Sequence, residues 1–338
     1  MNEGLWIGAM LAVVGGAMQG AFALPMKYAR KWQHENIWLV FAVSGLFVLP
    51  WILTISTIPN WLQIYRSSPV KLLAIVIVCG VGWGIGATLS GIAFRMLGIG
   101  LSFAIILGLS SLLGSLVPFL FQSQQRIEST QGVLYLVSTV AMLAGVAIVS
   151  AAGSMRDRDV AAVSSTAQTT RRFIAGLVVA IAAGVLSSLL SDAIAFTHAI
   201  VDATLRAGVN PVWASNIVLA LLTTGGLLAN VVYCAYELRR NKSGSLYFAK
   251  SSASHWVYGI LMGAFWYGGL MLYGLGEQRV GTVTGWPLFI GAMILSSSAT
   301  GFLTGEWKGA GRRSQIYLCI GSLVIFTALL VSGIAQNG

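Results

Sequence analysis

The chain has 338 residues, of which 57% are hydrophobic and 9% are charged, whereas a typical soluble domain carries about 25% charged residues. Together with a mean hydropathy of +0.82, this composition excludes a water-soluble fold of this size. The net charge of +10 could point to nucleic acid, but the basic residues form no contiguous face, so we expect no nucleic-acid binding.

Ten stretches of at least 19 residues contain no Asp, Glu, Lys or Arg. Each is long enough, or nearly so, to cross a hydrocarbon core of roughly 30 Å as a helix, which takes about 20 residues. They do not alternate apolar and polar residues as the strands of a β-barrel do. We therefore expect an all-α polytopic membrane protein with ten transmembrane helices, over residues 4–26, 36–65, 72–94, 96–125, 129–155, 173–191, 207–236, 251–276, 280–305 and 314–338.

Lysine and arginine are distributed unevenly between the two sides that ten helices would define. The loops on one side hold 15 of them, and the loops on the other side hold 5. Because positive residues collect on the cytoplasmic side, the richer side is predicted to be cytoplasmic. Both termini are then predicted to lie outside, in the periplasm, with the chain spanning the cell inner (plasma) membrane several times.

The longest polar connection, residues 153–172, divides the chain almost evenly into residues 1–152 and 173–338. We interpret it as a cytoplasmic linker between two repeats of five helices. An odd number of helices in each half places the halves in opposite orientations, as in many secondary transporters. A very short turn at Met96–Gly98 has a counterpart at Glu277–Arg279 in the second half, which supports two inverted repeats.

The sequence carries no catalytic or phosphate-binding motif. It lacks a Walker loop, a Gly-x-Ser-x-Gly elbow and a His-Glu-x-x-His pattern. We therefore expect no enzyme, no cofactor and no metal, and we favour gradient-driven transport of a solute. A membrane sensor or scaffold is the non-transport alternative, and the absence of a soluble domain argues against it.

Ionisable residues at membrane depth are costly and are candidates for function. Asp192 lies 20 residues after Arg172, or about 30 Å along a helix, with Ser188 one turn earlier on the same face. It is either an interfacial carboxylate that faces water or a proton-titrating or substrate-binding carboxylate that faces the central cavity. Glu277 is the second candidate, although Arg279 is close enough in sequence to keep it ionised or to form a solvated pair with it.

Amide side chains within the predicted helices must find polar partners, because lipid offers none. Gln19, Asn216 and Asn230 therefore either join helices together or bind the hydroxyl groups of a substrate.

Aromatic residues form two groups in the predicted helices. Those near helix ends are interpreted as an interfacial belt, namely Trp6, Trp32, Trp38, Trp51 and Trp61. Trp266 lies in the middle of a predicted helix beside Tyr267 and two glycines, where an indole face could stack on a sugar ring. Trp83 and Trp286 lie within or near the start of a helix and are candidates for the same cavity.

Several motifs along the whole chain resemble those of the L-rhamnose–proton symporters, a family of the drug/metabolite transporter superfamily. They are Pro25-Met26-Lys27 with Lys31-Trp32, Gly82-Trp83-Gly84-Ile85-Gly86 with Arg95-Met96-Leu97-Gly98, Gly208-Val209-Asn210-Pro211, Trp266-Tyr267, and Glu306-Trp307-Lys308 with Ala310-Gly311-Arg312-Arg313. The resemblance implies a ten-helix carrier built from inverted repeats.

This chain departs from the family pattern at three positions. The resemblance implies an acidic residue near Gly285, an apolar residue at Gln19 and an apolar residue at Asp192. A coupling group that has moved, or a different substrate, would account for these departures.

We therefore expect uptake of a small neutral sugar, L-rhamnose or a related monosaccharide, by proton symport with alternating access. The alternative is an exporter or facilitator of amino acids or other metabolites without proton coupling. The expected partners are the sugar, a proton and the lipid bilayer, and the chain is expected to be a monomer or a weak homodimer. Asp192 is the preferred coupling residue, ahead of Glu277, and the predicted substrate residues are Gln19, Trp83, Trp266, Tyr267, Trp286 and Asn230.

Overall fold

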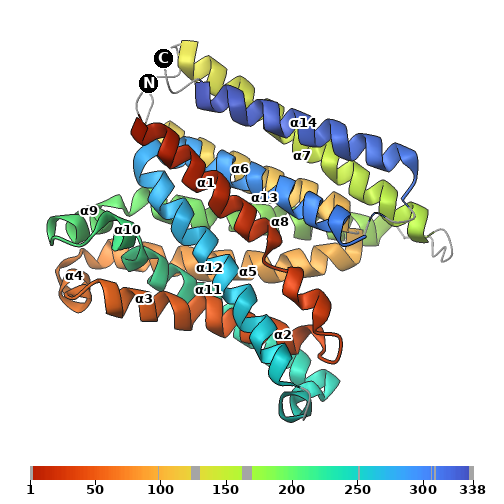
Figure 1. The fold of residues 1–338 in the computed structure, drawn as a ribbon, viewed down its shortest axis with the longest axis horizontal. Helices are drawn as coiled ribbons and strands as arrows, with labels where there is room; N and C mark the ends of the chain where they lie inside the picture. Colours follow the sequence, from red (N-terminus) through yellow and green to blue (C-terminus); the bar gives the residue numbers. More distant parts are fainter. Residues whose placement is uncertain are drawn as a thin grey trace.

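The computed structural model describes residues 3–97, 99–122, 130–161, 170–249, 252–305, 307 and 310–334, and these residues form helices without a strand. Long helices cross the molecule and short helical segments connect them (Figure 1). The all-α architecture predicted from the composition is confirmed.

The first half of the chain contains a helix interrupted by one wide turn. Pro50 has no N–H group to donate to the carbonyl of Leu46, and the π-helical segment η2 (Ser44–Val48) lies at that point between α2 (His34–Val43) and α3 (Leu49–Thr57). The remaining elements of this half are α1 (Glu3–Ala21), η1 (Leu24–Tyr28), α4 (Trp61–Ser67), α5 (Val70–Leu97), α6 (Ile99–Gln122) and α7 (Thr130–Ala161).

In the second half, helix α12 is followed by Gly281, whose φ of 74° favours glycine. The turn therefore lies at Gly281 and not at Glu277–Arg279 as predicted, since helix α12 continues to Val280. Similarly, α7 continues to Ala161, well into the predicted linker 153–172. The elements are α8 (Thr170–Phe196), α9 (His198–Arg206), α10 (Pro211–Ala214), α11 (Asn216–Asn241), η4 (Ser243–Phe248), α12 (Ala253–Val280), α13 (Thr282–Leu303) and α14 (Arg312–Ile334).

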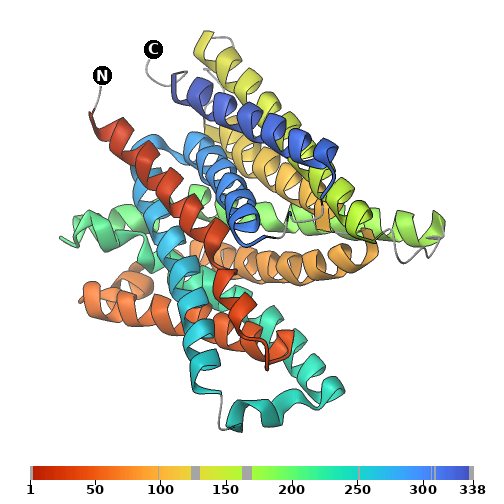
Figure 2. The ribbon, with the colours of Figure 1, turned by 45° about the vertical axis from the view of Figure 1, so that its right-hand side comes forward.

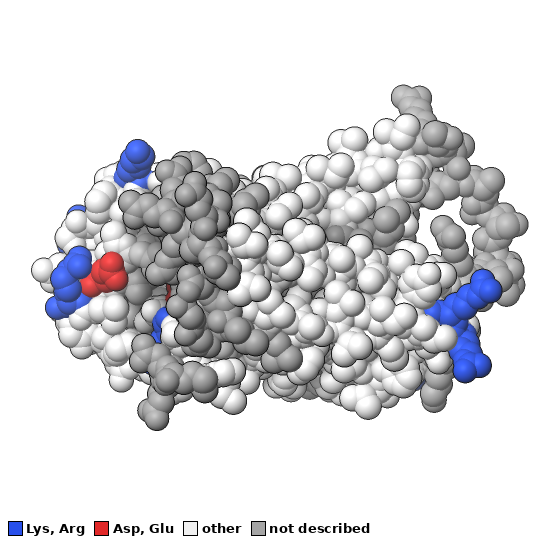
Figure 3. Space-filling model, turned by 90° about the horizontal axis from the view of Figure 1, so that it is seen from above, with Lys and Arg blue, Asp and Glu red and all other residues white. Residues whose placement is uncertain are grey.

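Eight helical stretches of the described residues are long and apolar enough to cross a membrane, which confirms a polytopic membrane protein. On the face in Figure 3, charged side chains gather toward the two ends of the long axis, and the described surface between them is uncharged. The eight stretches are Gly4–Tyr28, His34–Thr57, Val70–Ala93, Leu136–Arg156, Phe173–Arg206, Pro211–Asn241, Ala253–Val280 and Thr284–Leu303.

The two halves of the chain are interleaved. Helix α1 packs most extensively against α12 and α13 of the second half, whereas α8 packs most extensively against α5 and α6 of the first half. Helices α1 and α12 approach so closely that a Cβ atom added at Gly15 would lie 2.5 Å from the carbonyl oxygen of Gly269. Glycine at this position therefore permits the contact. Helices α7 and α14 pack against each other along one side of the molecule (Figures 1 and 2).

Contacts between connecting segments identify the two ends of the molecule. At one end, the side chain of Lys27 donates to Thr304, and Asn36 donates to the carbonyl of Ser243 over 3.0 Å. Burial raises the pKa of Tyr247 to about 12, so its hydroxyl stays protonated and donates to the carbonyl of Asn36 over 3.0 Å.

The opposite end holds the start of α1 and the end of α14 (Figure 1). There, the hydroxyl of Tyr65 donates to the carbonyl of Ile217 over 2.6 Å, and burial raises the pKa of Tyr65. His198 contacts Glu277 at the same end.

Candidate functional site

A cavity of about 240 Å³ lies among helices that come from both halves of the chain. Five of the six predicted substrate residues line it, and they come from α1, α5, α11, α12 and α13. The lining residues are Gln19, Phe22, Trp38, Phe41, Leu46, Trp83, Ala87, Ser90, Ile106, Leu107, Ser110, Ser187, Leu190, Asn230, Trp266, Leu270, Trp286, Phe289, Ile290 and Met293.

Gln19, Trp83 and Trp266 form one continuous part of the cavity wall. The side-chain amide of Gln19 donates to the carbonyl of Trp266 over 3.1 Å, and Gln19 is 7% exposed. The rings of Trp83 and Trp266 lie 5.3 Å apart with an angle of 31° between their planes. Two indole rings from different halves of the chain therefore meet at the cavity.

Asn230 continues this wall and is held by two hydrogen bonds. Its side-chain N–H donates to the carbonyl of Gly226 over 2.9 Å, and its oxygen accepts a hydrogen bond of 2.9 Å from the indole of Trp38. The ring of Trp83 lies against Gly226, since a Cβ atom added there would be 2.4 Å from Trp83 Cζ3. The amide of Asn230 is thus fixed in orientation beside the two tryptophans.

Trp38 lines the cavity, so its interpretation as part of the interfacial belt is wrong. Its ring stacks on His34 at 5.1 Å and packs against Phe41 at 4.9 Å. Trp32, six residues earlier, is buried against Tyr247 at the end of the molecule. Trp32 precedes α2, whereas Trp38 lies within α2 and donates to Asn230 of α11. The local sequence does not reveal this difference, because it depends on a contact with a distant helix.

Trp286 lies on the side of the cavity formed by α13. Its indole N–H donates to the carbonyl of Ser110 on α6 over 3.1 Å, and its ring stacks on Phe289 at 5.6 Å. Its only N–H donor is therefore already used by the protein, and its contribution to the cavity is the apolar surface of the ring.

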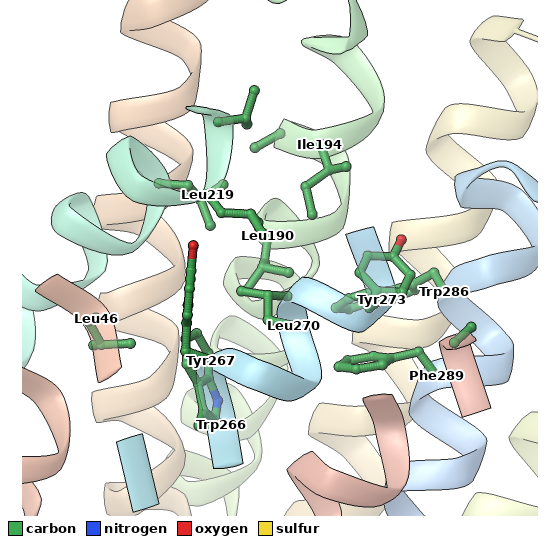
Figure 4. Close-up of a cluster of buried hydrophobic side chains, with 14 of the residues drawn as sticks. Leu46, Leu190, Ile194, Leu219, Trp266, Tyr267, Leu270, Tyr273, Trp286 and Phe289 are labelled. Carbon is green, nitrogen blue, oxygen red and sulfur yellow. The ribbon is translucent and has the colours of Figure 1, made fainter. Parts of the chain in front are cut away.

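Tyr267 does not line the cavity, although its neighbour Trp266 does. Its side chain points away from that of Trp266 (Figure 4), is 1% exposed, and donates to the side-chain oxygen of Asn216 over 2.9 Å. Adjacent residues of a helix are about 100° apart around its axis, so α12 directs one of the two aromatic rings into the cavity and the other into the core.

Asp192 is buried within the protein, with 8% of its surface exposed, so the water-facing alternative is wrong. The hydroxyl of Ser188 donates to its Oδ2 over 3.1 Å, as expected from their spacing, while its Oδ1 is buried without a partner among the described residues. Asp192 does not line the cavity itself, but Leu190, two residues earlier, does.

Glu277 is 2% exposed within α12, and its Oε1 lies 2.8 Å from Nε2 of His198. From the sequence, Arg279 is expected to hold Glu277 ionised from a shared turn. Instead, Arg279 donates to the carbonyl of Leu275 over 2.9 Å, and the imidazole of His198 contacts the carboxylate. The partner of Glu277 comes from the α8–α9 junction, which sequence proximity could not reveal.

The described residues that line the cavity include aromatic rings, amides and hydroxyls but no charged side chain. Within the described part of the chain, no group of three His, Cys, Asp or Glu residues could hold a metal ion. Small-molecule sites generally combine apolar walls with a few placed polar groups. This arrangement therefore suits a neutral solute that has both an apolar face and hydroxyl groups.

Comparison with known proteins identifies similar sequences over the full chain. The model of the family described as L-rhamnose-proton symport protein (RhaT) matches residues 1–337. Curated relatives include the L-rhamnose-proton symporter of Cronobacter sakazakii, at 28% identity, and those of Yersinia pestis and Yersinia pseudotuberculosis, each at 26%. Each alignment covers 99% of this chain and 99% of the relative.

Proposed function

The chain belongs to the L-rhamnose-proton symport protein family, and we propose that it carries L-rhamnose into the cell together with a proton. The uncharged cavity at the junction of the two halves is the observation that supports this function. The family is one of transporters, which confirms the expectation that the chain is not an enzyme.

The dimensions and chemistry of the cavity match a monosaccharide. Its volume of about 240 Å³ lies below the roughly 300 to 1,000 Å³ of pockets for drug-sized ligands. The indoles of Trp83 and Trp266 offer apolar faces to a sugar ring, while the amides of Gln19 and Asn230 can bind its hydroxyls. Trp286 supplies a further aromatic surface, and Tyr267 supports the site from the core.

Uptake of labelled L-rhamnose into proteoliposomes tests the function directly. An imposed gradient with the external side acidic should drive accumulation above the external concentration, and a protonophore should abolish it. Sugar flux that does not respond to the gradient would contradict proton coupling. Amino-acid flux without L-rhamnose flux would support the alternative of a metabolite exporter or facilitator.

Asp192 is the group best suited to carry the proton. A buried carboxylate without a cationic partner is costly when charged. Within the described part of the chain, Ser188 is the one hydrogen-bond partner of the Asp192 carboxyl group. Asp192 would hold a proton in the conformation described here, in which it is buried. It would release the proton in the opposite conformation of the transport cycle, when water reaches its carboxyl group. Glu277 is the second candidate, and its contact with His198 compensates a negative charge.

The first helix of each half packs against helices of the other half. This symmetry supports the proposal of ten transmembrane helices in two inverted repeats, residues 1–152 and 173–338. If α1 corresponds to α8, then the pairing of α1 with α12 and α13 corresponds to the pairing of α8 with α5 and α6. The pattern Gly-x-x-Trp-x-x-Gly occurs at Gly80–Gly86 of α5 and again at Gly263–Gly269 of α12. The connecting segments also meet at alternate ends, as ten crossings require.

The same packing suggests which parts move during transport. One body would contain α1, α12 and α13, and the other would contain α8, α5 and α6. The packing of α1 on α12 and α13, and of α8 on α5 and α6, is more extensive than the packing of any helix pair between the two groups. The cavity lies between the two bodies, so a rocking motion would expose it alternately to each side. The moving bodies thus differ from the two halves of the sequence.

The orientation in the inner membrane follows from the positive-inside rule. The end that joins Lys27 to Thr304 would face the cytoplasm, and both termini would face the periplasm.

A further inference from the structure

Hydrogen bonds at one end of the molecule join the two groups of helices that are proposed to move. At this end, here called the His198 end, Nε2 of His198 lies 2.8 Å from Oε1 of Glu277. The side-chain amide of Gln278 donates to the hydroxyl of Ser215, which donates to the carbonyl of Gly274 over 3.3 Å. Helix α12 contributes one side of these contacts, whereas His198 follows α8 and Ser215 precedes α11, which packs on α5. They therefore connect the body of α1, α12 and α13 to the body of α5, α6 and α8.

The contact of His198 with Glu277 differs from the neighbouring neutral contact because it places a carboxylate inside the protein. The side chain of Glu277 is 2% exposed, and that of His198 is 37% exposed. A buried carboxylate is costly without a partner. When the helices part, however, water can solvate both groups, so the contact is exchanged for hydration and can form again. The pair is thus suited to a contact that opens and closes.

The protein is tightly packed between this pair and the cavity. In three helical segments, the lining residue nearer the His198 end is at most 3% exposed, while one nearer the opposite end is partly exposed: Leu46 and Trp38, Leu190 and Ser187, and Trp286 and Met293. The ring of Trp286 packs against Tyr273 at 5.4 Å (Figure 4), and a Cβ atom added at Gly114 of α6 would lie 2.6 Å from its Nε1. These side chains close the cavity toward the His198 end.

We propose that His198 and Glu277 form a latch that closes the sugar path on the periplasmic side, and that this contact must break before the cavity can open to the periplasm. The inference rests on the proposed function and on its orientation, in which the His198 end faces the periplasm. It gives His198 a role in transport, and it gives Glu277 a role in gating that differs from proton carriage by Asp192.

The latch also explains how Asp192 can keep a proton that it has taken up. Along α8, the cavity residue Leu190 is followed by Asp192, and His198 comes just after the helix. Asp192 therefore lies between the cavity and the latch, and it is 8% exposed. While the latch is closed, periplasmic water does not reach its carboxyl group. The proton is then retained until the protein changes to the conformation that is open to the cytoplasm.

Labelling of a cysteine in the cavity from each side of the membrane tests the latch. The reporter is Ser187→Cys, at a lining position, in a chain whose native cysteines are replaced by alanine, namely Cys79, Cys234 and Cys319. A membrane-impermeant maleimide reaches the cavity from the periplasm in intact cells and from the cytoplasmic side in inside-out vesicles. His198→Ala should raise the labelling rate in cells about fivefold and lower it in vesicles, because loss of a contact to a charged group shifts the population toward the open conformation.

Glu277→Gln keeps the shape of the side chain and a neutral hydrogen bond, so it should act in the same direction by about twofold. Arg206→Gln is the matched control, because Arg206 is exposed at the other end of the same short helix, α9. Both of its labelling rates should equal those of the unchanged protein.

Unchanged rates in both latch variants would overturn the inference. Faster labelling from both sides would also overturn it, because a loosened fold and not a shift between two conformations would then be the cause. The labelling uses no sugar, so absence of L-rhamnose uptake by the unchanged protein would contradict the proposed function independently of the latch.

Discussion

At the scale of single residues, Asp192 and Glu277 show how differently two buried carboxyl groups can be placed. Glu277 lies 2.8 Å from an imidazole nitrogen, whereas Asp192 has a serine hydroxyl at 3.1 Å and one oxygen without a partner among the described residues. A charge without a partner in an apolar setting favours neutralisation. This contrast makes Asp192 the residue on which proton coupling should depend.

We expect Asp192→Asn to abolish accumulation of L-rhamnose against its gradient while sparing exchange of sugar across the membrane. Asparagine has nearly the same shape but cannot release a proton. The measurement is uptake and counterflow in the same proteoliposomes. Ser188→Ala, which removes the hydroxyl's contacts with Asp192 at 3.1 Å and with the carbonyl of Val185 at 2.9 Å but leaves the carboxyl group in place, should retain accumulation. Continued accumulation by Asp192→Asn would exclude this role, and loss of coupling in Glu277→Gln would assign it to Glu277.

Trp266 and its neighbour Tyr267 provide a second test at this scale. Trp266→Ala should weaken L-rhamnose binding about 30-fold, since loss of a central aromatic contact costs about 2 kcal/mol. Tyr267→Phe removes the hydrogen bond to Asn216 and should lower stability by about 1 kcal/mol without changing sugar affinity. Calorimetric titration and thermal unfolding in detergent separate the two effects. Unchanged affinity of folded Trp266→Ala would contradict stacking on the sugar.

At the scale of helices, the approach of α1 to α12 depends on glycine at specific positions. A Cβ atom at Gly269 would lie 2.5 Å from the carbonyl oxygen of Gly15, which is backbone and cannot move aside. We expect Gly269→Ala to destabilise the protein by about 1 to 3 kcal/mol, as overpacking does elsewhere. The midpoint of thermal unfolding measures the loss.

Gly268→Ala is the matched control for this packing. The nearest atom to its added Cβ is the terminal methyl of Met18 at 3.1 Å, the far end of a flexible side chain. Alanine also favours a helix over glycine by about 1 kcal/mol, so the unfolding midpoint should stay the same or rise. Equal destabilisation by both variants would show that the α1–α12 contact is not the cause.

At the scale of the whole molecule, the distribution of charge predicts the orientation in the membrane. Because 15 of the 20 Lys and Arg residues lie on one predicted side, the C-terminus should face the periplasm. Alkaline phosphatase fused after Gly338 should be active, and green fluorescent protein at the same position should be dark. Fusions after Lys242 should give the opposite pair, and a reversed result at both positions would invert the orientation.

The candidate site could be predicted from the sequence only in part. An amide or indole in the middle of an apolar helix stands out in any sequence, which is why Gln19, Trp83 and Asn230 were identified. Trp38 was missed because tryptophan near a helix end is usually interfacial, and only the contact with Asn230 distinguishes it. Tyr267 was included because it adjoins Trp266, although its ring enters the core.

The sequence by itself determined the class of protein, because an apolar chain with few charges can satisfy its backbone in lipid only as helices or a closed barrel. It also determined where most helices lie, since apolar stretches between charges are local features. Only the tertiary structure decided that α1 joins α12 and α13 while α8 joins α5 and α6. That choice depends on contacts between residues far apart in the sequence, such as Gly15 with Gly269 and Gly86 with Leu186, and these contacts create the cavity between the two groups of helices.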